Sequence, residues 1–315
     1  MDNQFETPVL FLIFNRPDTT QQVFNQIRQI KPKYLFVAAD GPRSVRPEEL
    51  SLCTETREII QKVDWKCEVK TLFQDKNLGC GKAVSGAINW FFEQVEYGII
   101  LEDDCIPDLS FFPYCEELLI KYKYDEQVMH IGGNNFQKGI QRGEASYYFS
   151  FYPHIWGWAT WRRAWEYYDY EMKDFYLTFN SGGIGHVFQN RNEKNYWRKI
   201  FIKTFKMQAN TWDYQWAYTI WKNKGFSITP NVNLVINLGL NGDSSHTFLK
   251  DSFKNNLNLN VIPFPIKHPS LIVDYEADKT TFNNSFSHSI NRLIRLFKEN
   301  GISRITKYVI EKYIK

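Results

Sequence analysis

Short apolar runs alternate with segments of helical spacing through the first hundred residues. The apolar runs predict strands at Val9–Phe14, Tyr34–Ala39 and Glu68–Phe73, and another from Tyr97 onward. The segments between them predict helices after Asp18, through Leu50–Ile60 and from about Lys82 to Val95. Strands that alternate with helices are typical of a doubly wound, mostly parallel α/β sheet, and this is the fold class that we predict.

The first of these helices has a recognisable start. Asp18 and Gln21 have the spacing of a capping box, which satisfies backbone amides that the first turn leaves without partners. The apolar face of this helix consists of Val23, Phe24, Ile27 and Ile30. Further along the chain, Val128–Ile131 predicts another strand.

Tryptophan is concentrated in the segment HIWGWATWRRAW, residues 154–165. Trp158, Trp161 and Trp165 recur at helical spacing, which favours the buried aromatic face of a helix over a ligand site. Trp156 precedes this periodicity and is the better candidate for stacking on a ligand, although burial in the core is the more frequent outcome for such a ring. A helix around Trp212 to Lys222 carries Asp213 among aromatic side chains.

The predicted strand at Tyr97 ends in an acidic triplet, Glu102, Asp103 and Asp104. Three adjacent carboxylates repel one another, so they need either solvent or a cation. If the strand stays extended, Glu102 and Asp104 lie on one side and Asp103 on the other. Oxygen ligands at a strand end suit Mg²⁺ or Mn²⁺. From this stretch alone, a solvated acidic turn and a metal site both stay open.

The predicted sheet brings other polar groups to the same place. Open α/β sheets bind ligands beyond the carboxyl ends of their strands. Asn15 and Arg16 follow the first predicted strand, Asp40 follows the second, and the acidic triplet follows the fourth. Because these strand ends meet along one edge, the arrangement favours the metal interpretation of the triplet.

Composition narrows the class of protein. The 315 residues are 43% hydrophobic and 23% charged, as in soluble globular proteins, and the length permits one large domain or two ordinary ones. The 10 Trp, 18 Tyr and 25 Phe either fill a core or stack on flat ligands. A net charge of only +3 argues against a nucleic-acid-binding protein.

The cysteines and the two ends of the chain bear on the cellular compartment. The five cysteines include no CxxC pair, and no apolar run is long enough for a signal peptide or a membrane span, so we expect a cytoplasmic protein. Residues 289–315 carry a net charge of +5 and an apolar face. This segment either lies on an anionic membrane surface or packs on the domain, and both alternatives stay open.

Several segments together resemble the GT-A fold glycosyltransferases, which use nucleotide sugars. The acidic triplet resembles the DXD motif of that fold, in the EDD form of N-acetylglucosaminyltransferase I. The segments that match in order are FNRP at 14–17, Asp40, EDDCIPDLSFF at 102–112 and TWDYQW at 211–216. HIWGWATWRRAW and NLGLNGDSSHT at 237–247 resemble a bacterial branch of hemolysin-like sugar transferases.

The resemblance covers about residues 8–250 and implies a domain organisation. Residues 1–250 would form the GT-A domain, with a nucleotide-binding half at 1–135 and an acceptor half at 136–250. Residues 251–315 would form a C-terminal extension with basic amphipathic helices.

The resemblance also implies roles for residues that bind the donor. Asp104 would be the direct ligand of Mn²⁺ or Mg²⁺, Glu102 would reach the metal through water, and Asp103 would contact the ribose. Arg16, with Asn15 beside it, would face the nucleotide or its phosphates. Asp40 would accept a hydrogen bond from the base, which we expect to be uracil.

Further roles follow for the rest of the site. Lys82 is assigned to the nucleotide side, and His246 to the metal or the diphosphate. Asp213 would be the catalytic base, and Trp156 and Trp212 would contact the acceptor. WDYQW departs from the family's WDDW segment by one extra residue and lacks the second acid. The assignment of the catalytic base is therefore less secure than the assignment of the metal site.

The implied reaction is transfer of a sugar from a nucleotide donor, with UDP expected, to a hydroxyl of a glycan or lipid-linked glycan. One base and one metal predict inversion at the anomeric carbon. The implied setting is the biosynthesis of bacterial surface glycans, and contact of the C-terminal segment with the inner membrane face would fit it.

Three other classes of protein share some of these features but fit the sequence less well. A P-loop ATPase needs GxxxxGK[ST], but Gly81-Lys82 is followed by Ala83, and Lys76 stands where the first glycine belongs. A sugar-phosphate nucleotidyltransferase shares the sheet and the metal, yet would have a glycine-rich loop where Asn15 and Arg16 stand. A non-catalytic sugar-binding protein explains the tryptophans but leaves the acidic triplet and Asp213 without a role.

Overall fold

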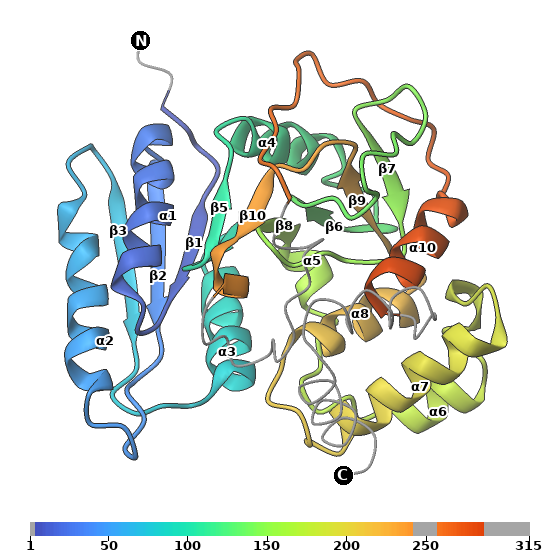
Figure 1. Cartoon of the computed structure of the whole chain (residues 1–315), viewed down its shortest axis with the longest axis horizontal. Coiled ribbons are helices and arrows are strands. Elements are labelled where there is room, and N and C mark those ends of the chain that lie inside the picture. Colours follow the sequence, from blue (N-terminus) through green and yellow to red (C-terminus); the bar gives the residue numbers. More distant parts are fainter. Residues whose placement is uncertain (1–3, 242–256, 287–315) are drawn as a thin grey trace.

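The computed structural model describes residues 4–241 and 257–286 as a mixed α/β protein (Figure 1). The strands are β1 (Val9–Ile13), β2 (Tyr34–Ala39), β3 (Glu68–Phe73), β4 (Tyr97–Glu102), β5 (Cys105–Pro107), β6 (Val128–Gly132), β7 (Tyr147–Ser150), β8 (Trp158–Trp161), β9 (Phe226–Pro230) and β10 (Val235–Asn237). The α-helices are α1 (Pro17–Ile30), α2 (Glu49–Glu58), α3 (Cys80–Phe92), α4 (Phe111–Lys121), α5 (Arg162–Trp165), α6 (Phe175–Asn180), α7 (Arg191–Phe205), α8 (Asp213–Lys222) and α10 (Tyr275–Thr281). The remaining short helical segments are η1 (Ile59–Lys62), η2 (Gly185–Val187), η3 (Leu238–Asn241) and η4 (Phe282–Phe286).

A single eight-stranded sheet forms the centre of the described structure, in the order β3-β2-β1-β4-β8-β6-β9-β7. β3, β2, β1 and β4 are parallel neighbours, and β6 is parallel to β9. β8 runs antiparallel between β4 and β6, and β7 runs antiparallel to β9. Helices flank the sheet (Figure 1). The predicted fold class, a mostly parallel α/β sheet with flanking helices, is therefore confirmed.

The four parallel strands lie where the apolar runs predicted them. Every residue of β1 is buried, as expected for a continuous apolar run with covered faces. The predicted capping box of α1 is wrong. The helix begins at Pro17, so Asp18 lies inside the first turn, and Arg16 is the N-cap residue without a side-chain cap. Proline is common at the first helical position because its fixed φ suits the helix and because an N–H at this position would have no partner within the helix.

Trp158, Trp161 and Trp165 are buried, as predicted, but the predicted helix is wrong for the first two. Trp158 to Trp161 form β8, and only α5 is helical. Extended backbone is required there because β8 pairs with β4 on one side and β6 on the other. Trp158 stacks on Trp212, the N-cap residue of α8, whereas the Trp161 indole donates to the carbonyl of Leu119 in α4. The two rings thus serve opposite faces of the sheet.

Much of the aromatic content forms a core between β8 and α8. Trp158 and Trp212 stack at 5.5 Å, and Trp165 stacks on Tyr168 at 4.2 Å. Trp216, which is fully buried, lies 5.0 Å from Trp165. Close-packed rings of this kind contribute apolar burial and edge or stacking contacts. These rings therefore serve the fold rather than a ligand.

His130 of β6 is a neutral histidine inside this core. Its Nε2 lies 3.0 Å from the carbonyl oxygen of His154, and its Nδ1 accepts from the indole of Trp216 at 3.2 Å. The ring also stacks on Trp158 at 5.0 Å. Burial lowers the pKa of His130 to about 3. A second proton would have to be placed on Nδ1, where it would face the N–H of Trp216.

We expect His130 to make stability depend on pH. Between its ordinary pKa near 6.5 and its folded pKa, the unfolded chain binds a proton that the folded chain does not. Folding stability should therefore fall as pH drops below about 6.5, by about 1.4 kcal/mol per pH unit from this residue. Urea unfolding at pH 7.5 and 5.5 measures this in the wild type and in His130→Gln. Equal losses in both proteins would show that His130 does not carry the dependence.

The described part of the C-terminal region, residues 257–286, is attached to the sheet. Val273 forms a β-bridge with Phe149 of β7. Asp278 of α10 accepts hydrogen bonds from the hydroxyl of Ser150 and, at 3.0 Å, from the amide of Phe151. Burial raises the pKa of Asp278 to about 7. The predicted boundary at residue 250 and the basic segment 289–315 lie outside the described residues. Within them, none of the helices has the length and apolar character needed to cross a membrane.

Candidate functional site

The parallel register brings the polar strand ends to one edge of the sheet. Leu12 of β1 pairs with Glu102 of β4, and β2 pairs with β1 on the other side. Arg16, Asp40 and the acidic triplet therefore follow neighbouring strand ends along this edge. The chain leaves β1 toward β2 and returns to β4 on the opposite side. β1 and β4 thus flank a topological switch point, where α/β sheets bind ligands.

Arg16 forms ion pairs with two members of the acidic triplet. Its Nη2 lies 2.5 Å from Asp103 Oδ1, and its Nη1 lies 2.9 Å from Asp104 Oδ2. β4 ends at Glu102, and the chain turns at the two aspartates. The predicted alternation, with Asp103 opposite Asp104, is therefore wrong, because the turn directs both carboxylates to one guanidinium.

The other oxygens of these two carboxylates are held by fixed groups of the chain. The backbone amide of Phe14 donates to Asp103 Oδ2 at 3.2 Å. Asn237 Nδ2 donates to Asp104 Oδ1 at 3.1 Å, and the Cys105 thiol contacts the same oxygen at 3.4 Å. Asn237 is in position because β10 pairs antiparallel with β5. Each carboxylate is thus fixed on one side and bound to Arg16 on the other.

The triplet has less positive charge around it than its carboxylates need. Burial raises the pKa of Asp103 to about 6, and this outweighs the opposite effect of Arg16. Burial and then the charges of Asp104 and Asp103 raise the pKa of Glu102 to about 8. Burial alone would lower the pKa of Arg16, but the charges of Asp103 and Asp104 raise it overall. A further cation at this place would favour the charged carboxylates.

Gly239 of η3 packs closely against this ion pair. A Cβ at this position would lie 2.3 Å from Asp104 Oδ2 and 3.1 Å from Arg16 Nη1. The first distance is shorter than contacts that real Cβ atoms make. The absence of a side chain at residue 239 therefore lets η3 pack against the ion pair between Arg16 and Asp104.

Asp40 organises the loop that leads into α3. Its carboxylate accepts hydrogen bonds from the amides of Gly41, Leu78 and Gly79 and from the Asn77 side chain, at 2.8–3.0 Å. Four hydrogen bonds fill the acceptor capacity of a carboxylate. Asp40 therefore fixes the start of α3 in this structure, and a hydrogen bond to a base would require one of these contacts to open.

The start of α8 meets the start of α3 at the same edge. The Gly81 amide donates to the Asn210 side chain at 2.8 Å, and Gly79, with φ +81°, packs against that side chain. The hydroxyl of Thr211 donates to Asp213 Oδ1. The charge of Asp213 contributes to the raised pKa values of Glu102 and Cys80, after burial as the largest cause. Asp213 and the acidic triplet thus share one electrostatic environment.

The donor groups at this edge suit a hard divalent cation that arrives with a phosphate ligand. Mg²⁺ and Mn²⁺ usually take one or two protein carboxylates and complete their shell with phosphates and water. Within residues 4–241 and 257–286, Asp104 Oδ2 is bound only by Arg16, and the side-chain carboxylate of Glu102 accepts no hydrogen bond. In those residues, no group of three or more His, Cys, Asp or Glu side chains is arranged to hold an ion by itself. Asp104 and Glu102 are the carboxylates that a cation bound together with a phosphate could use here.

The remaining predicted residues differ in how they are placed. Asn15 is half-buried beside Arg16, and Lys82 is exposed in the first turn of α3. Trp156 is half-buried with its ring 5.2 Å from Phe136. Trp212 is only 2% exposed and stacks on Trp158, which counts against the predicted acceptor contact. His246 lies outside the described residues.

Several residues at the site were not predicted as functional. Asn237 anchors Asp104, Asn77 holds Asp40, and Asn210 binds the start of α3. Asn237 opens the segment NLGLNGDSSHT, but the sequence of that segment does not indicate its contact with Asp104. Asn134, two residues after β6, is fully buried, and its side-chain amide has no hydrogen-bond partner among the described residues. A single polar residue after a strand gives no signal for such contacts in the sequence.

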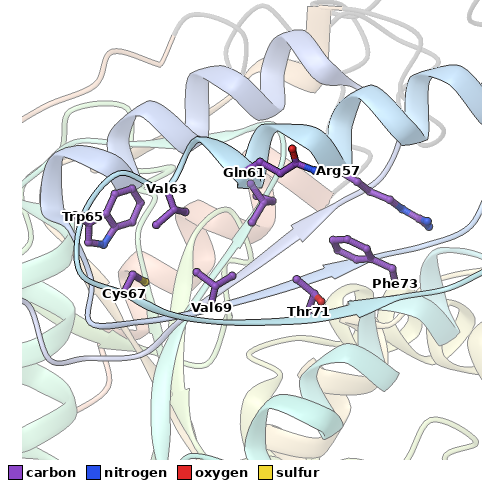
Figure 2. Close-up of a pocket in the computed structure, with 9 residues that line it drawn as sticks. Arg57, Gln61, Val63, Trp65, Cys67, Val69, Thr71 and Phe73 are labelled. Atoms are coloured by element: carbon purple, nitrogen blue, oxygen red, sulfur yellow. The ribbon is translucent and has the colours of Figure 1, made fainter.

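A pocket of about 400 Å³ lies away from this edge (Figure 2). It is formed between β3 and the α2–η1 region and is lined by Arg57, Ile60, Gln61, Val63, Trp65, Cys67, Val69, Thr71 and Phe73. The Arg57 guanidinium donates to the carbonyl oxygens of Asp40, at 3.1 Å, and of Gln74, at 2.7 Å. None of the predicted site residues lines this pocket.

No protein-family model and no curated protein sequence matches the chain. Among solved structures, S. aureus TarS 1–349 is similar over 98% of this chain and 75% of its own, with 9% identity and a TM-score of 0.42. HddC from Yersinia pseudotuberculosis covers 51% of this chain and 79% of its own, with 10% identity and a TM-score of 0.32. A UDP-glucose pyrophosphorylase complexed with UDP-glucose covers 51% and 78%, with 11% identity and a TM-score of 0.31. Similarities this distant do not assign an activity, which has to be inferred from the residues at the edge of the sheet.

Proposed function

We propose that this protein is a glycosyltransferase that moves a sugar from a UDP donor to a hydroxyl acceptor, with Mn²⁺ or Mg²⁺ bound and with inversion. The observation that carries the proposal is the convergence at one sheet edge of Arg16, the acidic triplet and Asp213, at the switch point between β1 and β4. A cation-binding group and a separate carboxylate are the two components that such a transfer needs.

The donor side of the site is built on the ends of β1 and β4 and the start of α3. Arg16 provides a planar guanidinium that can bind phosphate oxygens in bidentate fashion. In the proposal, Asp104 holds the cation directly, Glu102 holds it through water, and Asp103 faces the ribose. The bound ion would supply charge neutralisation for the departing diphosphate. Lys82, in the first turn of α3, adds positive charge near the phosphates.

Asp213 is the proposed base on the acceptor side. Its Oδ1 is held by the Thr211 hydroxyl, which orients the carboxylate at the start of α8. As the acceptor oxygen forms its bond to the anomeric carbon, its proton passes to Asp213. The bond from that carbon to the diphosphate breaks at the same time, and the electron pair leaves with UDP. Attack from the face opposite the leaving group inverts the anomeric centre.

A sugar-phosphate nucleotidyltransferase is the alternative, and its products differ. Such an enzyme breaks the bond between the α- and β-phosphates, whereas a glycosyltransferase breaks the bond between sugar and diphosphate. A panel of UDP-sugars incubated with Mn²⁺ would therefore yield UDP if the proposal is right. Formation of UTP and sugar phosphate from a UDP-sugar and pyrophosphate would identify the alternative. Residues 15–17 read Asn-Arg-Pro after β1, with no glycine-rich loop, which favours the transferase.

UDP is expected to raise the melting temperature only when Mn²⁺ or Mg²⁺ is present. A ligand at 100 times its dissociation constant stabilises the folded state by about 2.7 kcal/mol, which corresponds to a shift on the order of 5 °C for a chain of this size. Thermal scans with UDP and Mn²⁺, UDP and chelator, and Mn²⁺ alone make the comparison. Equal stabilisation by UDP in chelator would argue against a shared metal.

The proposal extends to the acceptor and the location. A hydroxyl of a glycan or of a lipid-linked glycan is the proposed acceptor, and the half-buried ring of Trp156 is the proposed stacking surface for it. Such an enzyme would work at the cytoplasmic face of the inner membrane. Cosedimentation of the full chain with anionic vesicles tests peripheral membrane contact.

A further inference from the structure

We propose that Arg16 acts as an exchangeable internal cation: it occupies the metal-binding oxygen of Asp104, together with one oxygen of Asp103, and transfers to the diphosphate when the metal and nucleotide bind. This inference rests on the proposed function. It differs from a simple phosphate-binding role because it makes Arg16 a competitor of the metal.

The hydrogen-bonding pattern separates two kinds of oxygen. Asp103 Oδ1 and Asp104 Oδ2 are bound by Arg16 and by no other described group. Asp103 Oδ2 is held by the Phe14 amide, and Asp104 Oδ1 is held by Asn237 and Cys105. Departure of Arg16 would therefore free two oxygens and leave both carboxylates anchored in place.

Arg16 itself is free to make this exchange. Its side chain is 39% exposed, and within the described residues its guanidinium bonds only to these two carboxylates. Gly239 packs close to Nη1, and with no side chain at that position it does not clash with the guanidinium. The backbone of Arg16 is fixed as the N-cap residue of α1, so only the side chain has to move.

The charges favour an exchange over simple addition of a metal. One guanidinium offsets one negative charge, whereas the triplet has three carboxyl groups, two of which pair with Arg16. A divalent cation supplies more positive charge to the carboxylates, and the diphosphate supplies a new anionic partner for Arg16. Because a guanidinium pairs with phosphate as readily as with carboxylate, Arg16 keeps a charged partner in both states.

The test is binding of Mn²⁺ alone, measured from the electron paramagnetic resonance signal of free Mn²⁺ with the full-length protein. Arg16→Ala is expected to bind Mn²⁺ on the order of tenfold more tightly than the wild type, because a charge-assisted competitor has been removed. The same variant should bind UDP with Mn²⁺ on the order of tenfold more weakly. Arg28→Ala is the matched control, because Arg28 pairs with Asp64 on the surface and should change neither affinity.

The outcomes distinguish this inference from the proposed function. Unchanged or weaker Mn²⁺ binding by Arg16→Ala, in a protein whose wild type binds UDP only with Mn²⁺, would overturn the exchange and leave the function standing. Wild-type protein that does not bind UDP with Mn²⁺ would overturn the proposed function. If Arg16→Ala does not fold, Arg16→Lys decides: it keeps the charge but loses the fork, so it should bind Mn²⁺ more tightly than the wild type, and equal binding would contradict the exchange.

Discussion

Asp213→Asn is expected to slow sugar transfer by about 10²–10⁴-fold while UDP and Mn²⁺ bind as before. Asparagine is close in size to aspartate and can still accept a hydrogen bond from the Thr211 hydroxyl, but it does not take up the acceptor proton. The loss should therefore appear in kcat rather than in donor affinity. Initial rates with the donor identified from the UDP-sugar panel, together with the UDP-dependent melting shift, measure the two effects separately.

Asp174→Asn provides the matched control for this variant. Asp174 also contacts α8, where it pairs with Lys222 at 3.1 Å and accepts from the Tyr218 hydroxyl at 2.8 Å. It should change stability slightly and the transfer rate very little. Normal turnover in Asp213→Asn would remove this residue from the mechanism, and an equal loss in both variants would point to a structural effect on α8.

Asp104→Asn is expected to weaken metal-dependent binding of UDP by roughly 100-fold or more, since it removes a charged ligand whose supporting contacts alone are typically worth 10–100-fold. The amide retains the shape of the carboxylate, and its oxygen can still accept from Asn237. Isothermal titration of UDP in the presence of saturating Mn²⁺ measures the loss. Binding in chelator, if there is any, should be the same in both proteins.

Asp64→Asn is the comparison for Asp104→Asn. Asp64 forms an ion pair with Arg28 on the surface, so its loss also breaks an aspartate–arginine pair, but away from the sheet edge. We expect no change in UDP binding. Full metal-dependent affinity in Asp104→Asn would mean that the cation is held elsewhere, and the assignment of the acidic triplet would then fail.

The parallel half of the fold could be predicted because its signals are local. β1, β2 and β4 contain apolar runs, β3 is a short extended segment, and helices lie between these strands, so their positions could be predicted from the neighbouring residues. β8 could not be predicted in the same way. Trp158 and Trp161 are extended because β4 and β6 pair with them, and these partners lie far away in the sequence. The spacing of these tryptophans in the sequence is the same as the spacing along one face of a helix.

The same distinction between local signals and distant contacts applies to the candidate site. The acidic triplet and Arg16 stand out because charged residues follow apolar strands, and the sheet then brings them together. The pairing of Arg16 with Asp104 joins residues 88 positions apart, and the anchoring of Asp104 by Asn237 spans 133 positions. Such contacts depend on tertiary structure. Trp212 is a further example, because its burial in the core next to the proposed base depends on tertiary contacts and not on its sequence neighbours.

The position of β8 has a consequence for how substrates enter and leave. β8 is hydrogen-bonded to β4, which carries the acidic triplet, and to β6, which leads toward the half with α8. The two halves are therefore joined through continuous sheet rather than through a linker. Hinge closure, with one half rotating over the other, would have to break these strand pairs. Opening and closing of the site should instead depend on side chains and short segments at the sheet edge, such as Arg16 and η3.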